Sequence, residues 1–175
     1  YISPTSATHV NQQLGDKIDY ILDGGDCTVG IESTIVGFEG EKVVVHRLGG
    51  ISIEKIESIV GKVEVKHQSS SNPTAPGMLE SHYAPKKQII IGDIEELIKQ
   101  HDNCGVLSFE KQFDDVKPQI QLSKTGDLDE AAQRLFGALR ELDNKEISLI
   151  LTELVPDHGL GRAINDRLKR AAAKR

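Results

Sequence analysis

The hydrophobic positions in the first part of the chain form short β-type runs. Ser33–Phe38 and Lys42–Arg47 are rich in β-branched residues and flank a glycine turn, so we predict a β-hairpin. Ile18–Leu22 and Lys62–Lys66 are the other expected strands. We also expect a helix at 3–14, capped by Ser3, and a second helix at 53–60. This part is therefore predicted to be mostly antiparallel β-structure with short helices.

Strands alternate with helices in the second part of the chain. Predicted strands cover 88–91, 105–108, 119–122 and 146–152, and predicted helices cover 93–101, 127–142 and 161–174. The helix at 127–142 is the clearest, because Leu128, Leu135 and Leu139 lie on one face of it. This alternation predicts a small parallel α/β sheet.

A proline-rich strap, Pro73–Pro85, separates the two parts. Proline fixes φ and disfavours the α region for the residue before it, so we expect an extended, semi-rigid segment. The strap ends in His82-Tyr83-Ala84-Pro85, and a plain spacer would need neither the histidine nor the tyrosine. These two side chains either close over a ligand or pin the strap to a domain.

Composition narrows the class of protein. The 175 residues are 38% hydrophobic without tryptophan, and no apolar run approaches the roughly 20 residues that span a bilayer. Cys27 and Cys104 match no metal-binding spacing, so we expect free thiols in a reducing cytoplasm. The net charge is −6, yet the segment 162–175 is basic. That segment either contacts phosphates or forms a solvated helix face.

Three short motifs carry candidate chemistry. The hydroxyl of Ser33, in Gly30-Ile31-Glu32-Ser33-Thr34, either binds a small polar ligand or satisfies local backbone. Arg47 precedes a glycine turn, where its fork of donors either clamps a phosphate or lies on the surface. Thr5 lies at the expected start of the first helix, which either attracts an anion or is simply capped.

The order of these motifs resembles a known family. S-P-T-S-A-x-H-V, G-I-E-S-T-I-V, P-G-M-x-x-x-H-Y-A-P and G-L-G-x-A-I-x-D-R-L-x-R-A-A occur together in the long, two-domain threonylcarbamoyl-AMP synthases, which are YrdC-like. The resemblance runs essentially from end to end. It implies an α/β fold in three parts. These are the C-terminal part of a twisted-sheet catalytic domain at 1–66, an interdomain linker at 67–86 and a small Rossmann-like domain at 87–175.

The resemblance also implies a reaction. Family members condense L-threonine, bicarbonate and ATP into threonylcarbamoyl-AMP and pyrophosphate, and other proteins then transfer the threonylcarbamoyl group to tRNA. Mg²⁺ is implied, although no ligands for it are identified in this sequence. No side chain is expected to act as a nucleophile, so catalysis would rest on positioning and charge neutralisation.

Site residues follow from the matching positions. The resemblance implies that Ser33 and His82 bind threonine and that Thr5, Arg47 and Tyr83 bind ATP. Leu48 stands where the family usually has proline, and Ser81 stands where a basic residue commonly precedes H-Y-A-P.

The family's remaining threonine pocket and a Lys-x-Arg phosphate clamp would precede Tyr1. We therefore expect little synthase activity from this polypeptide alone. The rival interpretation is a non-catalytic nucleotide- or RNA-binding module that uses Arg47 and the basic segment 162–175. A regulatory or assembly role for the small domain is a third possibility.

Overall fold

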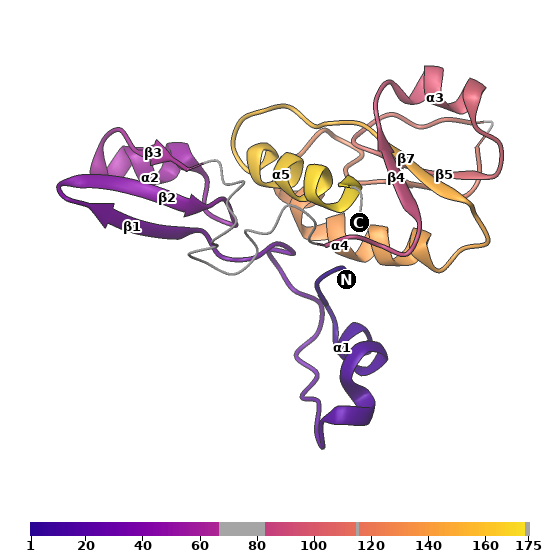
Figure 1. Cartoon of the computed structure of the whole chain (residues 1–175), viewed down its shortest axis with the longest axis horizontal. Helices are drawn as coiled ribbons and strands as arrows, with labels where there is room; N and C mark the ends of the chain where they lie inside the picture. The colour runs from indigo at the N-terminus through magenta and orange to yellow at the C-terminus, as the bar shows by residue number, and fades with distance from the viewer. Residues whose placement is uncertain (67–82, 115, 174–175) are drawn as a thin grey trace.

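The computed structural model describes residues 1–66, 83–114 and 116–173. Two separate sheets organise them, a three-stranded sheet with the order β1-β2-β3 and a four-stranded sheet with the order β4-β7-β5-β6. The two sheets lie at opposite ends of the molecule, with helix α5 between them, and helix α1 projects away from both (Figure 1). The mixed α/β class predicted from the sequence is confirmed.

The three-stranded sheet contains the predicted hairpin. β1 (Ile35–Glu39) pairs antiparallel with β2 (Lys42–Arg47). The turn between them passes through Gly40, whose φ of 61° favours glycine. Helix α2 (Ile53–Val60) then leads to β3 (Glu64–Val65), which pairs parallel to β2. The last strand is therefore shorter than predicted, and it departs from the antiparallel pattern.

The second sheet is entirely parallel, as the alternation of strands and helices predicts. Its elements in chain order are β4 (Gln88–Ile91), α3 (Ile94–Gln100), β5 (Cys104–Ser108), β6 (Gln119–Gln121), α4 (Leu128–Asp143), β7 (Leu149–Thr152) and α5 (Gly161–Ala172).

Helices cover both faces of this parallel sheet. Leu107 and Ile150 pack in one buried cluster with the side chains of α4 and α5. Their neighbours Val106 and Leu151 pack in a second cluster with Ile94 of α3. Successive residues of a strand point to opposite faces of the sheet. The sheet is therefore a middle layer, with α4 and α5 covering one face and α3 covering the other.

The first helix begins later than predicted. α1 spans Ala7–Leu14, and the Ser6 hydroxyl accepts a hydrogen bond from the His9 amide as the N-cap. Ser3 is therefore not the cap. Its hydroxyl instead donates to the Glu32 carboxylate at 2.8 Å, and this long-range bond competes with local capping. The predicted helix N-terminus at Ser3-Pro4-Thr5 is wrong.

The strand predicted at Ile18–Leu22 does not form. A short 3₁₀ turn, η1 (Gly15–Lys17), follows α1, and the next residues have no strand partner among those described. Tyr20 and Leu22 are 89% and 96% exposed. β-propensity mainly measures how side chains pack on a pleated surface, and no such surface lies beside this segment.

The two cysteines differ in exposure and are not bonded to each other. Cys27 is exposed, Cys104 is buried, and both are free thiols. Within the described ranges, every helix is too short or too polar to cross a membrane.

Candidate functional site

Ser33 and Arg47 lie together where β1 begins and β2 ends. The Arg47 Nε donates to the Ser33 carbonyl at 3.1 Å, and Nη2 donates to the Ser33 hydroxyl at 3.0 Å. The hairpin register sets this meeting, because Arg47 pairs with Ile35 across the two strands. A hydroxyl and a guanidinium at the edge of one sheet can together hold a polar, anionic ligand.

The glycine turn after Arg47 packs directly on the Ser33 segment. A Cβ atom at Gly49 would lie 2.3–2.4 Å from backbone atoms of Glu32, Ser33 and Thr34. The Gly50 amide also donates to the Glu32 carbonyl at 2.9 Å. Only glycine permits so close an approach of two backbones. The packing of this turn therefore fixes the position of the Ser33 backbone relative to that of Arg47.

Glu32 is the central acceptor of this region, and the sequence analysis assigned it no role. Its Oε1 accepts a hydrogen bond from Ser3 at 2.8 Å, and its Oε2 accepts two from Arg167 of α5, both at 3.1 Å. Burial alone would raise the pKa of Glu32. The Arg167 charge and the hydrogen bonds outweigh that effect and hold the pKa below its ordinary value of 4.5.

Tyr83 is buried in the hydrophobic cluster that includes side chains of α4 and α5. It is 1% exposed, its φ is 65°, and its ring stacks on Phe136 of α4 with centroids 5.3 Å apart. The Arg167 guanidinium lies 5.4 Å from the centre of the same ring. Burial is the main cause that raises the pKa of the Tyr83 hydroxyl, and the nearby Glu32 carboxylate raises it further.

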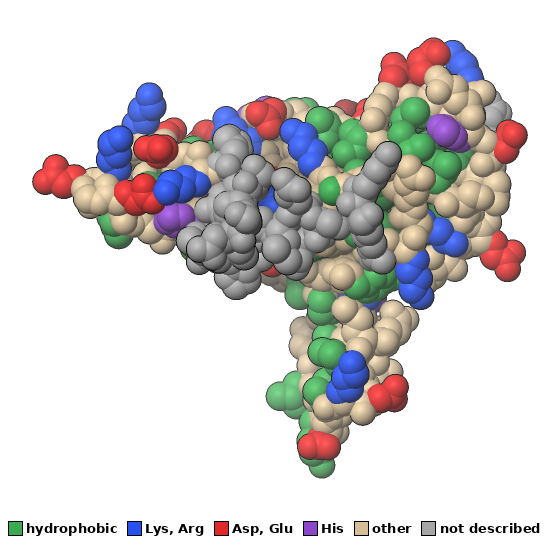
Figure 2. Space-filling model, in the orientation of Figure 1, with side chains coloured by type: hydrophobic (Ala, Val, Ile, Leu, Met, Phe, Trp, Pro, Cys, Tyr) green, Lys and Arg blue, Asp and Glu red, His purple; other side chains and the backbone are tan. Residues whose placement is uncertain are grey.

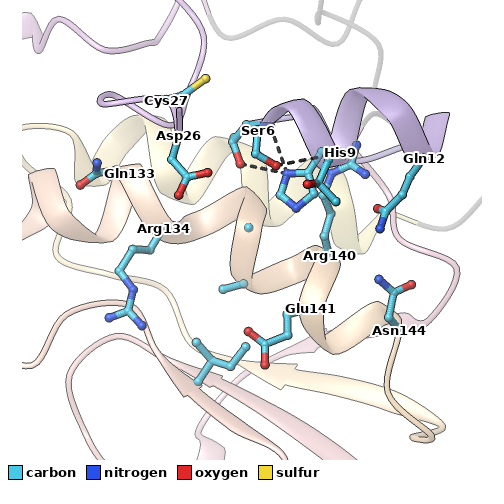
Figure 3. Close-up of a pocket in the computed structure, with 15 residues that line it drawn as sticks. Ser6, His9, Gln12, Asp26, Cys27, Gln133, Arg134, Arg140, Glu141 and Asn144 are labelled. Atoms are coloured by element: carbon cyan, nitrogen blue, oxygen red, sulfur yellow. Dashed lines mark hydrogen bonds between the residues drawn. The ribbon is translucent and has the colours of Figure 1, made fainter. Parts of the chain in front are cut away.

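Thr5 lies in a different place from the Ser33–Arg47 pair. Figure 3 shows the cavity that it lines, of about 590 Å³, between α1 and α4. Thr5 is buried there, with its amide and hydroxyl both 3.2 Å from His9 Nδ1. Burial, and then the nearby charge of Arg140, lower the pKa of His9. Neither Ser33 nor Arg47 is among the residues that line this cavity.

The remaining sequence-based candidates have different outcomes. His82 lies outside the described residues, so its proposed role stays a prediction. In the described part of the basic segment, Arg167 is buried and pairs with Glu32, whereas Arg162 pairs with Glu54 and Arg170 with Asp166 nearer the surface, and Lys169 is exposed. On the face shown in Figure 2, acidic and basic side chains are mixed rather than gathered into one basic patch.

A metal site is not evident in the part of the chain that the structure describes. No group of three or more His, Cys, Asp or Glu side chains lies close enough there to hold an ion. The fold and the site thus define an α/β protein whose candidate site pairs the Ser33 hydroxyl with the Arg47 guanidinium. Arg167 of α5, which packs on the parallel sheet, contacts this site through Glu32.

Comparison with known proteins identifies the family. Residues 51–173 match the model of the threonylcarbamoyl-AMP synthase C-terminal domain, and residues 1–49 match a model described as telomere recombination. The chain belongs to the threonylcarbamoyl-AMP synthase family.

Relatives in archaea and bacteria match nearly the whole chain. The threonylcarbamoyl-AMP synthase of Pyrococcus abyssi is 34% identical over 99% of this chain and 55% of its own length. That of Bacillus subtilis is 36% identical over 99% of this chain and 54% of its own length. The chain therefore spans about half the length of the curated relatives that it matches.

Solved structures of one relative share the fold. The crystal structure of P. abyssi Sua5 in complex with L-threonine has a TM-score of 0.88 and 34% identity, covering 98% of this chain and 54% of that one. A variant of P. abyssi Sua5, with an adjacent histidine and tyrosine replaced by alanine, has a TM-score of 0.87 and 33% identity, covering 98% of this chain and 53% of that one.

Proposed function

We propose that this chain is the C-terminal portion of a long, two-domain threonylcarbamoyl-AMP synthase. In this proposal, residues 1–66 complete a YrdC-like catalytic domain, 67–86 form the linker and 87–175 form a small Rossmann-like domain. The reaction converts L-threonine, bicarbonate and ATP into threonylcarbamoyl-AMP and pyrophosphate, and downstream proteins use the product to modify tRNA. The observation that carries the proposal is the TM-score of 0.88 to a relative whose structure contains L-threonine.

The roles of individual residues follow the chemistry of the site. Ser33 offers a hydroxyl to threonine, and Arg47 offers a guanidinium to the phosphates of ATP. The 3.0 Å bond between them supports the proposal, because a ligand held by the Ser33 hydroxyl would then lie beside a phosphate held by the Arg47 guanidinium. His82 is assigned to threonine, and Thr5 and Tyr83 are assigned to ATP.

Catalysis in this proposal rests on positioning. The Arg47 guanidinium would neutralise charge that develops on the phosphates, and no side chain of this chain is assigned as a nucleophile. When bound, Mg²⁺ would supply further neutralisation of phosphate charge. The described residues offer no acidic set for it, so we assign no step to the metal. The free thiols of Cys27 and Cys104 suit a reducing compartment such as the cytoplasm.

The test uses the full open reading frame that contains this chain. Pyrophosphate release from ATP is measured with and without threonine and bicarbonate, for the wild type and for Arg47→Ala and His82→Ala. We expect threonine-dependent release, and we expect Arg47→Ala to lower kcat/KM at least about tenfold, because it removes charged hydrogen bonds. Lys42→Ala is the matched control, since Lys42 is an exposed cation at the other end of β2.

The rival function is a non-catalytic nucleotide- or RNA-binding module. The absence of pyrophosphate release above background, both with and without threonine, would overturn the synthase proposal and favour this module. The module would bind RNA with a steep dependence on salt concentration, which the synthase does not require. The ion pairs made by Arg162, Arg167 and Arg170 leave less free positive charge for such contacts.

A further inference from the structure

A charged side chain from the parallel-sheet side is buried beside the candidate site. Arg167 of α5 is 1% exposed, and a buried cation is tolerated only when its donors are paired. Its Nε and Nη2 donate to Glu32, Nη2 also donates to the Leu48 carbonyl at 2.7 Å, and Nη1 donates to Asp166 at 2.8 Å. All three guanidinium nitrogens therefore have acceptors.

Two of these acceptors are immediate neighbours of the proposed binding residues. Glu32 precedes Ser33, and Leu48 follows Arg47. One planar guanidinium thus contacts both chain segments that present the hydroxyl–guanidinium pair. Because its fork of donors has fixed geometry, it sets the distance and orientation between those two segments.

The partners of Arg167 leave Glu32 little freedom. The second oxygen of Glu32 accepts a hydrogen bond from the Ser3 hydroxyl at 2.8 Å. The Glu32 carbonyl is bonded to Gly50 at 2.9 Å, next to the close approach of Gly49. Arg167 therefore acts on a segment that is held at its side chain and at its backbone.

We infer that Arg167 is a positioning residue, which holds Ser33 and Arg47 in their binding geometry through Glu32 and the Leu48 carbonyl. The parallel-sheet region thereby has a direct function at the site, in addition to its fold. This inference rests on the proposed function, because the geometry it maintains is that of the threonine and ATP sites.

The main test compares Arg167→Lys with Arg162→Lys in the full open reading frame. Arg162 is the matched control, because it lies on the same helix and also pairs across to the other sheet, with Glu54 of α2. Lysine keeps the charge of Arg167 but cannot reproduce its fork of donors. We expect Arg167→Lys to raise the KM for threonine about tenfold or more and Arg162→Lys to leave it within about twofold.

A second measurement reports geometry without any assay of the reaction. Hydrogen exchange, measured well below the unfolding temperature, should become faster at 30–34 and 47–50 in Arg167→Lys and in Glu32→Gln. The Arg162→Lys control should not change these segments. Glu32→Gln keeps the size of the side chain, so it also serves if a replacement of Arg167 fails to fold.

Each outcome separates the inference from the proposed function. Unchanged exchange at both segments, or faster exchange with an unchanged KM in an active enzyme, would overturn the positioning role. A lower unfolding temperature with an unchanged KM would mean that Arg167 only stabilises the fold, which overturns it as well. Wild-type protein without threonine dependence would instead refute the synthase proposal, and the exchange data would still show whether Arg167 holds the pair.

Discussion

Glu32 shows how one carboxylate depends on its surroundings. Its pKa lies below 4.5 because the Arg167 charge and the donated hydrogen bonds outweigh the effect of burial. A carboxyl group whose pKa falls on folding stabilises the protein at pH above its ordinary value. That stabilisation is lost as the pH falls through the lower, folded-state pKa.

This linkage predicts a pH-dependent effect of Glu32→Gln. At pH 7 the substitution should lower the free energy of unfolding by about 3 kcal/mol, because the buried Arg167 loses the Glu32 carboxylate and keeps Asp166 as a carboxylate partner. The difference should shrink as the pH falls below 4.5, where the wild-type carboxyl also becomes neutral. Urea unfolding at a series of pH values measures this. Glu41→Gln, in the exposed β1–β2 turn, is the control, and an equal difference at all pH values would contradict the prediction.

At the scale of the elements, periodic patterns were sufficient for most of the fold. α4 and the hairpin were predictable because an apolar stripe and a glycine turn each determine structure locally. The structure of the segment Ile18–Leu22 was not predictable in this way, because a strand needs a partner strand and the pattern of residues within the segment does not show whether one is present. The direction of β3 was missed for a similar reason, since two residues carry too little pattern to fix how they pair.

In the candidate site, too, local motifs were visible in the sequence and long-range contacts were not. Ser33 and Arg47 were candidates from the sequence because each lies in a short motif, and the structure brings their side chains within 3.0 Å of each other. Glu32 and Arg167 were not linked, because their contact joins residues 135 positions apart. A buried arginine in a basic, helical segment looks identical in sequence to an exposed one.

The contact between the Gly30 loop and α4 gives a prediction about two elements. Gly30 has a φ of 76°, and a Cβ there would lie 2.3 Å from backbone atoms of Gln133 in α4. Gly30→Ala should therefore lower the free energy of unfolding by more than about 3 kcal/mol, from strain and clash together. Gly25→Ala is the matched control, since Gly25 has a φ of 83° with nothing within 4 Å, and it should cost only about 1 kcal/mol. Equal losses in urea unfolding would show that the close approach contributes nothing.

At the scale of the whole molecule, the 175-residue chain spans about half of its relatives' length. We expect the chain alone to form threonylcarbamoyl-AMP at least about 100-fold more slowly than the full open reading frame, because the substrates would lack part of their enclosure. Comparison of pyrophosphate release by the two proteins tests this. Similar turnover would show that the 175-residue chain suffices for the reaction.

The contact between Glu32 and Arg167 also has a consequence for protein synthesis. The ribosome makes α5 after every other described element, and Arg167 of α5 follows Glu32 by 135 residues. Because synthesis proceeds at about 5–20 residues per second, Arg167 is added to the chain roughly 7 to 27 seconds after Glu32. A chain that is cut short before α5 would carry both Ser33 and Arg47 without the side chain that aligns them. The order of synthesis therefore makes the alignment of Ser33 and Arg47 one of the last events in the assembly of the site.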